Sequence, residues 1–292
     1  MVRIFICRKL PKAIYPLFAV AAVIYVFYKC FETQAADAHV TEYADIPVLM
    51  YHSIAERPSM AGDYLILPET FYSDMKYLHD NGYETVTAAQ TLEYAKNGGA
   101  FPEKPIIVTF DDGFLNNLTY ALPVFEEFNM CGTVNIVGSY CVKSAEYDDH
   151  DPNYAYLTNE EITVLAQSGR FEIGAHTYDM HGMSGRQGCR RNYNESEEEY
   201  AAALTEDCRL ENEYLLNECG MVTDVFAYPY GYISKGSGDI LYECGYKVLF
   251  TCYERHNIVE PCSVGENEPL YLDRYNRPSG ISTGDFMHSA GI

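Results

Sequence analysis

The chain has no tryptophan, few basic residues, and no cysteines in a C-x-x-C pattern. Its 20 Lys and Arg residues face 42 Asp and Glu residues, which gives a formal net charge of −22. Such a chain repels phosphate backbones, and this argues against a nucleic-acid partner. The cysteine spacing argues against a zinc knuckle or a thioredoxin-type site. The ten cysteines are either free thiols or, in an oxidising compartment, partly paired.

The first 31 residues have the pattern of a membrane-targeting segment. Four basic residues precede an apolar run over residues 13–28. This run is short for a bilayer core, which needs roughly 20 helical residues, but extending it through Phe31 makes a span feasible. The preceding positive charges predict a cytoplasmic N-terminus. We expect a cytoplasmic basic segment and signal anchor over 1–31, or a secreted protein if the small residues at 33–37 are cleaved.

Residues 32–44 are small and polar and are typical of a linker, and the rest of the chain, 45–292, forms one further domain. There, short apolar runs alternate with helical patterns. This alternation predicts an α/β fold with a largely parallel sheet, and about seven repeats suit a barrel. Chemistry in such folds lies at the C-terminal ends of the strands. The residues found there are His52, Asp111, Asp112, His176 and Tyr230.

Two adjacent carboxylates, Asp111 and Asp112, end the apolar strand predicted over Pro105–Phe110. One of them can bind a divalent cation while the other stays free as a base. Gly113 permits a sharp exit from the strand. The same Asp-Asp-Gly run also makes a good turn, so this motif alone leaves a functional and a structural interpretation open.

His176 and His181 are five positions apart, a spacing that does not place two side chains on one helix face. Across a strand end and the following loop, both can converge on one metal ion. Together with Asp112 they make a His₂Asp set, which leaves coordination positions for water and substrate. A metal-bound water is a nucleophile at neutral pH, and a second carboxylate can take its proton. Two surface histidines in a loop are the alternative for the pair alone.

Three motifs resemble those of the polysaccharide deacetylase family, the NodB-homology or carbohydrate esterase 4 group: Thr109–Gly113, His176–His181 and Phe226–Gly231. The opening Pro47–His52 and the His spacing resemble the branch that includes poly-N-acetylglucosamine deacetylases. The resemblance covers roughly residues 45–280. It implies a distorted (β/α)7-type barrel and a catalytic domain over residues 45–292, preceded by the N-terminal membrane helix.

The resemblance also implies roles for single residues. Asp111 would be the general base. The Tyr230 backbone N–H, after Pro229, would help to hold an oxyanion. One divalent metal ion, zinc first and cobalt, nickel or iron as alternatives, would be bound by three residues: Asp112, His176 and His181.

Two departures from the family pattern stand out. Ala227 lies where many members have an arginine that supports the base, and Arg274 and Arg277 are the two candidates to replace that arginine. The usual C-terminal Leu-x-His motif, which supplies a general acid, is missing. A circular permutation would put the first strand where the usual last strand lies. His52 would then protonate the leaving amine, with a packed strand-end histidine as the alternative.

The implied reaction is metal-dependent hydrolysis of N-acetyl groups on an extracytoplasmic polysaccharide, such as poly-N-acetylglucosamine or peptidoglycan. The implied partners are that polysaccharide and, through the N-terminal helix, a membrane. Two alternatives remain at this point. One is an O-acetyl esterase of the xylan type on the same scaffold, and the other is a non-catalytic carbohydrate-binding protein.

Overall fold

The computed structural model describes residues 43–147, 150–182 and 186–292. The chain divides into two units after Val40, and the described fold belongs to the second of them. The predicted anchor at 1–31 and almost all of the predicted linker at 32–44 lie outside the described residues. Within the described ranges, no helix has both the length and the apolar character needed to cross a bilayer.

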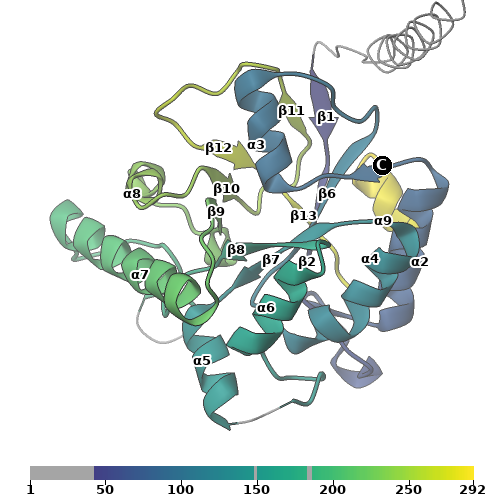
Figure 1. The fold of residues 1–292 in the computed structure, drawn as a ribbon, viewed down its shortest axis with the longest axis horizontal. Helices are drawn as coiled ribbons and strands as arrows, with labels where there is room; N and C mark the ends of the chain where they lie inside the picture. Colours follow the sequence, from purple (N-terminus) through teal and green to yellow (C-terminus); the bar gives the residue numbers. More distant parts are fainter. Residues whose placement is uncertain (1–42, 148–149, 183–185) are drawn as a thin grey trace, which may run out of the picture. The chain divides into compact units, whose positions relative to one another are not determined.

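One sheet forms the centre of the fold, and every strand pairing in it is parallel, as predicted (Figure 1). Its order is β12-β10-β9-β8-β7-β6-β2-β13, with β5 paired to β6. The strands are β2 (Val48–Tyr51), β5 (Glu84–Thr85), β6 (Pro105–Phe110), β7 (Gly132–Ile136), β8 (Phe171–Ala175), β9 (Val225–Ala227), β10 (Val248–Phe250), β12 (Leu270–Leu272) and β13 (Tyr275–Asn276). Two small pairs lie outside it, β1 (Ala44–Ile46) with β11 (Asn257–Val259), and β3 (Ser53–Ile54) with β4 (Leu65–Ile66).

The sheet is a half-barrel rather than a closed barrel. The sequence pattern over residues 270–275 predicts one strand, but this prediction is wrong, because β12 and β13 lie at opposite ends of the strand order. Only Asp273 and Arg274 separate these two strands. Since consecutive Cα atoms are 3.8 Å apart, the two ends of the sheet come within about 11 Å of each other. The distorted barrel is thus confirmed in this open form, while the circular permutation stays a prediction.

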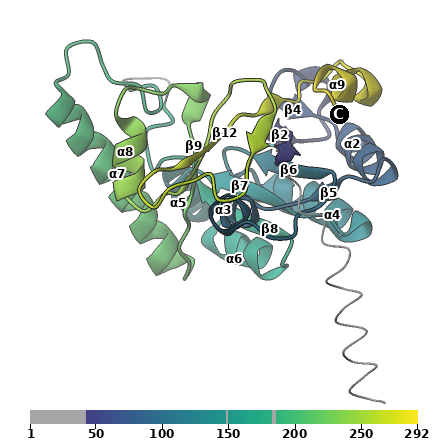
Figure 2. The ribbon, with the colours of Figure 1, turned by 90° about the horizontal axis from the view of Figure 1, so that it is seen from above.

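Helices cover the sheet on its outer face and close one end of it (Figure 2). They are α2 (Pro68–Asp80), α3 (Ala88–Asn97), α4 (Leu122–Phe128), α5 (Gly138–Tyr147), α6 (Asn159–Gln167), α7 (Glu197–Glu218), α8 (Ser237–Glu243) and α9 (Thr283–Ser289). The run Thr158–Glu161 has the sequence of a capping box, and it opens α6 as that pattern predicts; Ser196 caps α7 in the same way. Sequence patterns do not predict α5, α8 or α9. The helical periodicity over residues 116–129 predicts one helix, which in the structure begins as a π-helix at Asn117–Ala121.

Alternate residues of each strand pack into two different parts of the core. Leu49 and Val108 contact the cluster that includes α2, α4, α6 and α9, whereas Val48 and Ile107 contact the cluster that includes α3. Side chains in a strand alternate between faces with a period of two. His52 and Asp111 therefore continue the series of Val48 and Ile107, which directs both toward the inner face where the strands end.

Candidate functional site

A cavity of about 360 Å³ opens at the C-terminal ends of the central strands. It is lined by Met50, His52, Tyr64, Asp111, Asp112, His176, His181, Tyr230, Cys252 and Asn276. Six of these were singled out from the sequence, and they come from five separate segments of the chain. The fold therefore brings together residues that lie up to 178 positions apart, from His52 to Tyr230.

Three of the lining residues have the arrangement of a metal site. Asp112 Oδ1 lies 3.1 Å from His181 Nε2 and 3.7 Å from His176 Nε2. All three ligand atoms lie within 4.8 Å of one another. Asp112 Oδ1 is also buried, and it accepts no hydrogen bond of good geometry from the described residues. Two imidazole nitrogens and a carboxylate oxygen, so placed, fit one divalent ion such as Zn²⁺.

The histidine rings are held with their Nε2 atoms toward Asp112. His176 Nδ1 donates to the Ala227 carbonyl oxygen at 2.8 Å, which leaves the Nε2 lone pair free for a ligand. Burial lowers the pKa of His176 to about 4, so this ring is neutral near pH 7. His181 Nδ1 lies 3.3 Å from the Tyr230 hydroxyl, which itself donates to the His181 carbonyl oxygen at 2.7 Å.

The backbone is unusual at three points around this site. Asp112, Thr177 and Tyr230 have φ values of 74°, 75° and 57°, in the left-handed region that residues other than glycine rarely adopt. Such conformations persist where the surroundings hold them, and they cluster at functional sites. Residue 231 must also be glycine, because the Cβ of any larger residue would lie 2.8 Å from the Cys252 Cβ and clash with it.

Asp111 is buried beside the metal site and is held by fixed donors. Arg274 binds it in a bidentate manner, with Nη1–Oδ1 at 2.7 Å and Nη2–Oδ2 at 2.8 Å, and Asn135 Nδ2 donates to Oδ1 at 2.8 Å. Burial acts to raise the pKa of Asp111, but Arg274 and then His176 outweigh it and hold this pKa well below the usual range. Asp111 is therefore an ionised carboxylate at neutral pH, as a base must be.

Arg274 rather than Arg277 makes up for the missing arginine at Ala227. Arg274 reaches Asp111 through the opening between the two ends of the sheet. Arg277 is equally buried, but it binds Asp74 of α2 and makes no contact with Asp111. The two alternatives left open by the sequence are thus separated by their partners.

His52 lines the cavity and packs edge-on against Tyr64, with the ring centroids 4.8 Å apart. Its Nδ1 is buried and has no hydrogen-bond partner among the described residues. Burial lowers the pKa of His52, although Asp112 and Asp111 act to raise it. The ring is therefore neutral at rest and must gain a proton before it can act as an acid.

Pro229 and Tyr230 lie in the 3-10 turn Pro229–Gly231, which follows β9. Pro229 is buried, whereas Tyr230 is 40% exposed and forms part of the cavity wall. The predicted role of the Tyr230 backbone N–H in holding an oxyanion stays a prediction. The structure adds a second use for this residue, because its hydroxyl orients His181.

Sequence reasoning missed two neighbours of Asp111. Asn135 is a polar residue in the middle of a buried strand, and this exception to the apolar pattern could have identified it. Gly174 on the adjacent strand makes room for it, since a Cβ there would lie 2.2 Å from Asn135 Oδ1. Cys252, whose sulfur lies 3.8 Å from Arg274 Nη2, carries no comparable signal in the sequence.

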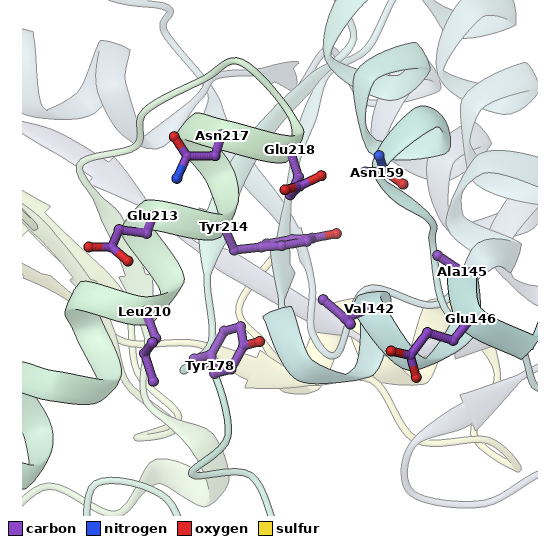
Figure 3. Close-up of a pocket in the computed structure, with 10 residues that line it drawn as sticks. All are labelled: Val142, Ala145, Glu146, Asn159, Tyr178, Leu210, Glu213, Tyr214, Asn217 and Glu218. Carbon is purple, nitrogen blue, oxygen red and sulfur yellow. The ribbon is translucent and has the colours of Figure 1, made fainter.

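A second cavity, of about 520 Å³, lies among α5, α6 and α7 (Figure 3). Carboxylates and tyrosines line it, among them Glu146, Glu213, Glu218, Tyr178 and Tyr214. None of the site residues predicted from the sequence belongs to its wall. Its tyrosine Tyr178 nevertheless follows His176 by two positions, so the wall of this cavity is continuous with the loop that joins the two histidines.

Comparisons with known proteins identify the family to which this chain belongs. A family model described as polysaccharide deacetylase matches residues 98–249, just over half of the chain. The YxkH protein of Bacillus subtilis, named as a polysaccharide deacetylase, is 27% identical over 83% of this chain and 75% of its own length. The poly-beta-1,6-N-acetyl-D-glucosamine N-deacetylase of Escherichia coli K12 is 26% identical over 70% of this chain, but this matches only 33% of that longer protein.

Among solved structures, a de-N-acetylase from Aggregatibacter actinomycetemcomitans superposes with a TM-score of 0.69 at 20% identity. The match covers 84% of this chain and 99% of that one, and it shows a shared fold. The chain therefore belongs to the polysaccharide deacetylase family, and the resemblance seen in its motifs is confirmed.

Proposed function

We propose that this member of the polysaccharide deacetylase family removes N-acetyl groups from a polysaccharide by metal-dependent hydrolysis. The observation that carries the proposal is the placement of Asp111, ionised and fixed by Arg274, beside the three potential metal ligands. The name of the Escherichia coli relative supports an N-acetylated glucosamine polymer as substrate. Poly-N-acetylglucosamine and peptidoglycan both fit this class.

The metal ion would be held by Asp112, His176 and His181. A divalent ion in such a set lowers the pKa of water and polarises a carbonyl group. Zinc fits two imidazoles and one carboxylate, and cobalt, nickel and iron accept the same donors. The neutral His176 ring offers its lone pair without first losing a proton.

The protein residues then divide the proton transfers between them. Asp111 accepts the proton of the attacking water, and the Arg274 guanidinium keeps this carboxylate in place. The Tyr230 backbone N–H stabilises the negative charge on the former carbonyl oxygen. His52 takes up a proton from solvent before the amide bond breaks and gives this proton to the leaving nitrogen. Asp111 returns the proton of the water to solvent when the products leave. The products are acetate and a free amine on the polymer.

We further propose that the catalytic domain lies outside the cytoplasm, tethered by the N-terminal segment or secreted after its cleavage. The basic residues before the apolar run support this location. An acetylated matrix or wall polysaccharide would be accessible there, whereas a cytoplasmic enzyme would not meet it.

Acetate release by the full-length protein, supplied with Zn²⁺ or Co²⁺, tests the proposed chemistry. Asp111→Asn should lower the release of acetate from an N-acetylglucosamine oligomer by about 10²–10⁴-fold, the range typical of a lost general base. The matched control is Asp80→Asn on α2, an exposed carboxylate that should keep full activity. Equal rates for wild type and Asp111→Asn would refute the mechanism.

The same assay separates the alternatives. Release from O-acetyl xylan but not from the N-acetylglucosamine oligomer would favour the esterase. Binding of the polymer without acetate release from any substrate would favour a non-catalytic carbohydrate-binding protein.

A further inference from the structure

The loop between the two histidines is shaped by contacts from outside the cavity. Thr177 is fully buried, and its φ of 75° is costly for a β-branched residue. This conformation turns the chain sharply after His176, so that His181 can return toward Asp112. A loop of this shape needs partners that hold it, because an unrestrained threonine would leave the left-handed region.

Asp207 of α7 is the strongest of these partners. Its Oδ2 accepts the Tyr178 N–H at 2.8 Å, and its Oδ1 accepts the Asp179 N–H at 2.9 Å. The carboxylate is buried, with 6% of its residue surface exposed. The two carboxylate oxygens of Asp207 thus accept hydrogen bonds from the two consecutive backbone N–H groups that directly follow Thr177.

The loop is tied on its other side to the start of α5. Ser139 N–H donates to the Tyr178 carbonyl oxygen at 2.9 Å, and the Ser139 hydroxyl donates to Asp179 Oδ1, also at 2.9 Å. One turn along α7 from Asp207, Glu211 Oε2 accepts the Gly138 N–H at 3.1 Å. Helix α7 therefore holds two neighbouring segments by two buried carboxyl groups, and of these two carboxyl groups Asp207 is the one that hydrogen-bonds to the loop between the histidines.

We propose that Asp207 is a positioning residue that sets the separation of His176 and His181 for metal binding. It acts by fixing the amides that follow Thr177, and it touches neither the substrate nor the metal ion. This inference rests on the metal site of the proposed function. It assigns a role to a buried carboxylate of α7 that lies outside the three family motifs.

Metal affinity of the full-length protein tests this role without using enzymatic activity. Zn²⁺ binding is measured by calorimetry and Co²⁺ binding by its visible absorption, for wild type, Asp207→Asn and Glu211→Gln. In Asp207→Asn an amide NH₂ replaces one acceptor oxygen and faces a backbone N–H, so one amide loses its partner. We expect metal affinity to fall about 10–100-fold, as is typical when the groups that orient metal ligands are changed.

Glu211→Gln is the matched control, since it makes the same carboxyl-to-amide change in an equally buried residue of the same helix. The glutamine keeps an acceptor for the Gly138 N–H, and Glu211 makes no hydrogen bond to the amides after Thr177. We therefore expect the metal affinity of Glu211→Gln to stay within about twofold of wild type. If Glu211→Gln lowers affinity as much as Asp207→Asn does, the effect is a general loss of packing and the proposal is wrong.

A rescue variant separates positioning from stability. Gly at position 177 adopts a positive φ without strain. Adding Thr177→Gly to Asp207→Asn should therefore recover part of the lost metal affinity, even though removing a buried side chain lowers the melting temperature. Absence of any recovery would overturn the idea that Asp207 acts through Thr177.

The remaining outcomes are also decisive. If Asp207→Asn does not fold, Ser139→Ala removes a second tether of the same loop and should weaken metal binding in the same direction by a smaller factor. Metal binding that is unchanged in these loop variants overturns the proposal while the metal site stands. If wild type itself binds neither Zn²⁺ nor Co²⁺, the metal site fails and this inference fails with it.

Discussion

The protein has two buried arginine–carboxylate pairs whose arginines are three residues apart in the chain. The two pairs lie in different surroundings, one at a cavity and one in the core. Arg274 binds Asp111, and Arg277 binds Asp74. Both guanidinium groups are fully buried, and both pairs have at least one N–O distance below 2.9 Å. Yet the first carboxylate lines the cavity, while the second lies inside the packed core.

The Asp74 carboxylate has only structural partners. Besides Arg277, it accepts the Tyr51 hydroxyl at 3.1 Å and the Thr283 hydroxyl at 2.6 Å. These bonds join α2, β2 and the start of α9. Asp111, by contrast, has an oxygen 3.9 Å from His176 Nε2 at the edge of an open space. The same kind of ion pair therefore joins elements of the fold in one place, and in the other it keeps ionised the carboxylate that we propose as the base.

Arg274→Gln should give the largest difference in activity between the two arginine–carboxylate pairs. Without the guanidinium, burial raises the pKa of Asp111 and the base is protonated over more of the pH range. We expect kcat/KM for acetate release to fall about 10²–10⁴-fold near neutral pH. Because the base must be ionised, the acidic limb of the pH–rate profile should move to higher pH. A profile that does not move would mean that Arg274 does not control Asp111.

Arg277→Met should lower the stability of the protein and leave its activity nearly unchanged. It leaves Asp74 buried without its cation, and breaking a buried pair in this way costs about 3–5 kcal/mol of unfolding free energy. Urea denaturation measures this loss, and acetate release per folded molecule should stay within twofold of wild type. A large fall in that specific activity would show that the second pair also serves the site.

Thr283→Ala should give the smallest effect. It removes one hydrogen bond to the carboxylate of Asp74, and a bond to a charged group is worth about 1.5–3 kcal/mol. The expected result is a small shift of the urea midpoint with unchanged kcat and KM. If Thr283→Ala lowered the activity and left the urea midpoint unchanged, the purely structural role assigned to Asp74 would be wrong.

The difference between the two arginines could not be read from the sequence. Both lie in the same short segment, and the strand predicted there breaks into β12 and β13 at opposite ends of the sheet. What could be predicted was local: the strand ends that carry Asp111 and His176, and the turn at Gly113. Which arginine reaches a given carboxylate depends on the curvature of the sheet. The hydrophobic periodicity of the sequence does not predict this curvature.

Asp207 shows a signal that the sequence did contain. The apolar residues Tyr200, Leu204, Cys208 and Leu215 repeat with helical spacing and mark the buried face of α7. Asp207 lies on that face, one position before Cys208. A carboxylate on the buried side of a helix needs partners, as a charged residue there is costly. Its partners are the backbone N–H groups of Tyr178 and Asp179. Because every residue except proline has such a group, the sequence does not show which ones Asp207 binds, and its role becomes visible only in the folded structure.

The Arg274–Asp111 pair also has a consequence for how the protein is made. Its two members are 163 positions apart, so during synthesis the carboxylate leaves the ribosome long before the arginine. Until the segment around Arg274 docks between the ends of the sheet, Asp111 has no cation to hold it ionised in a buried place. In the proposed mechanism, a chain that ends before Arg274 would carry the three proposed metal ligands and still lack an ionised base. Activity would then require the segment between β12 and β13.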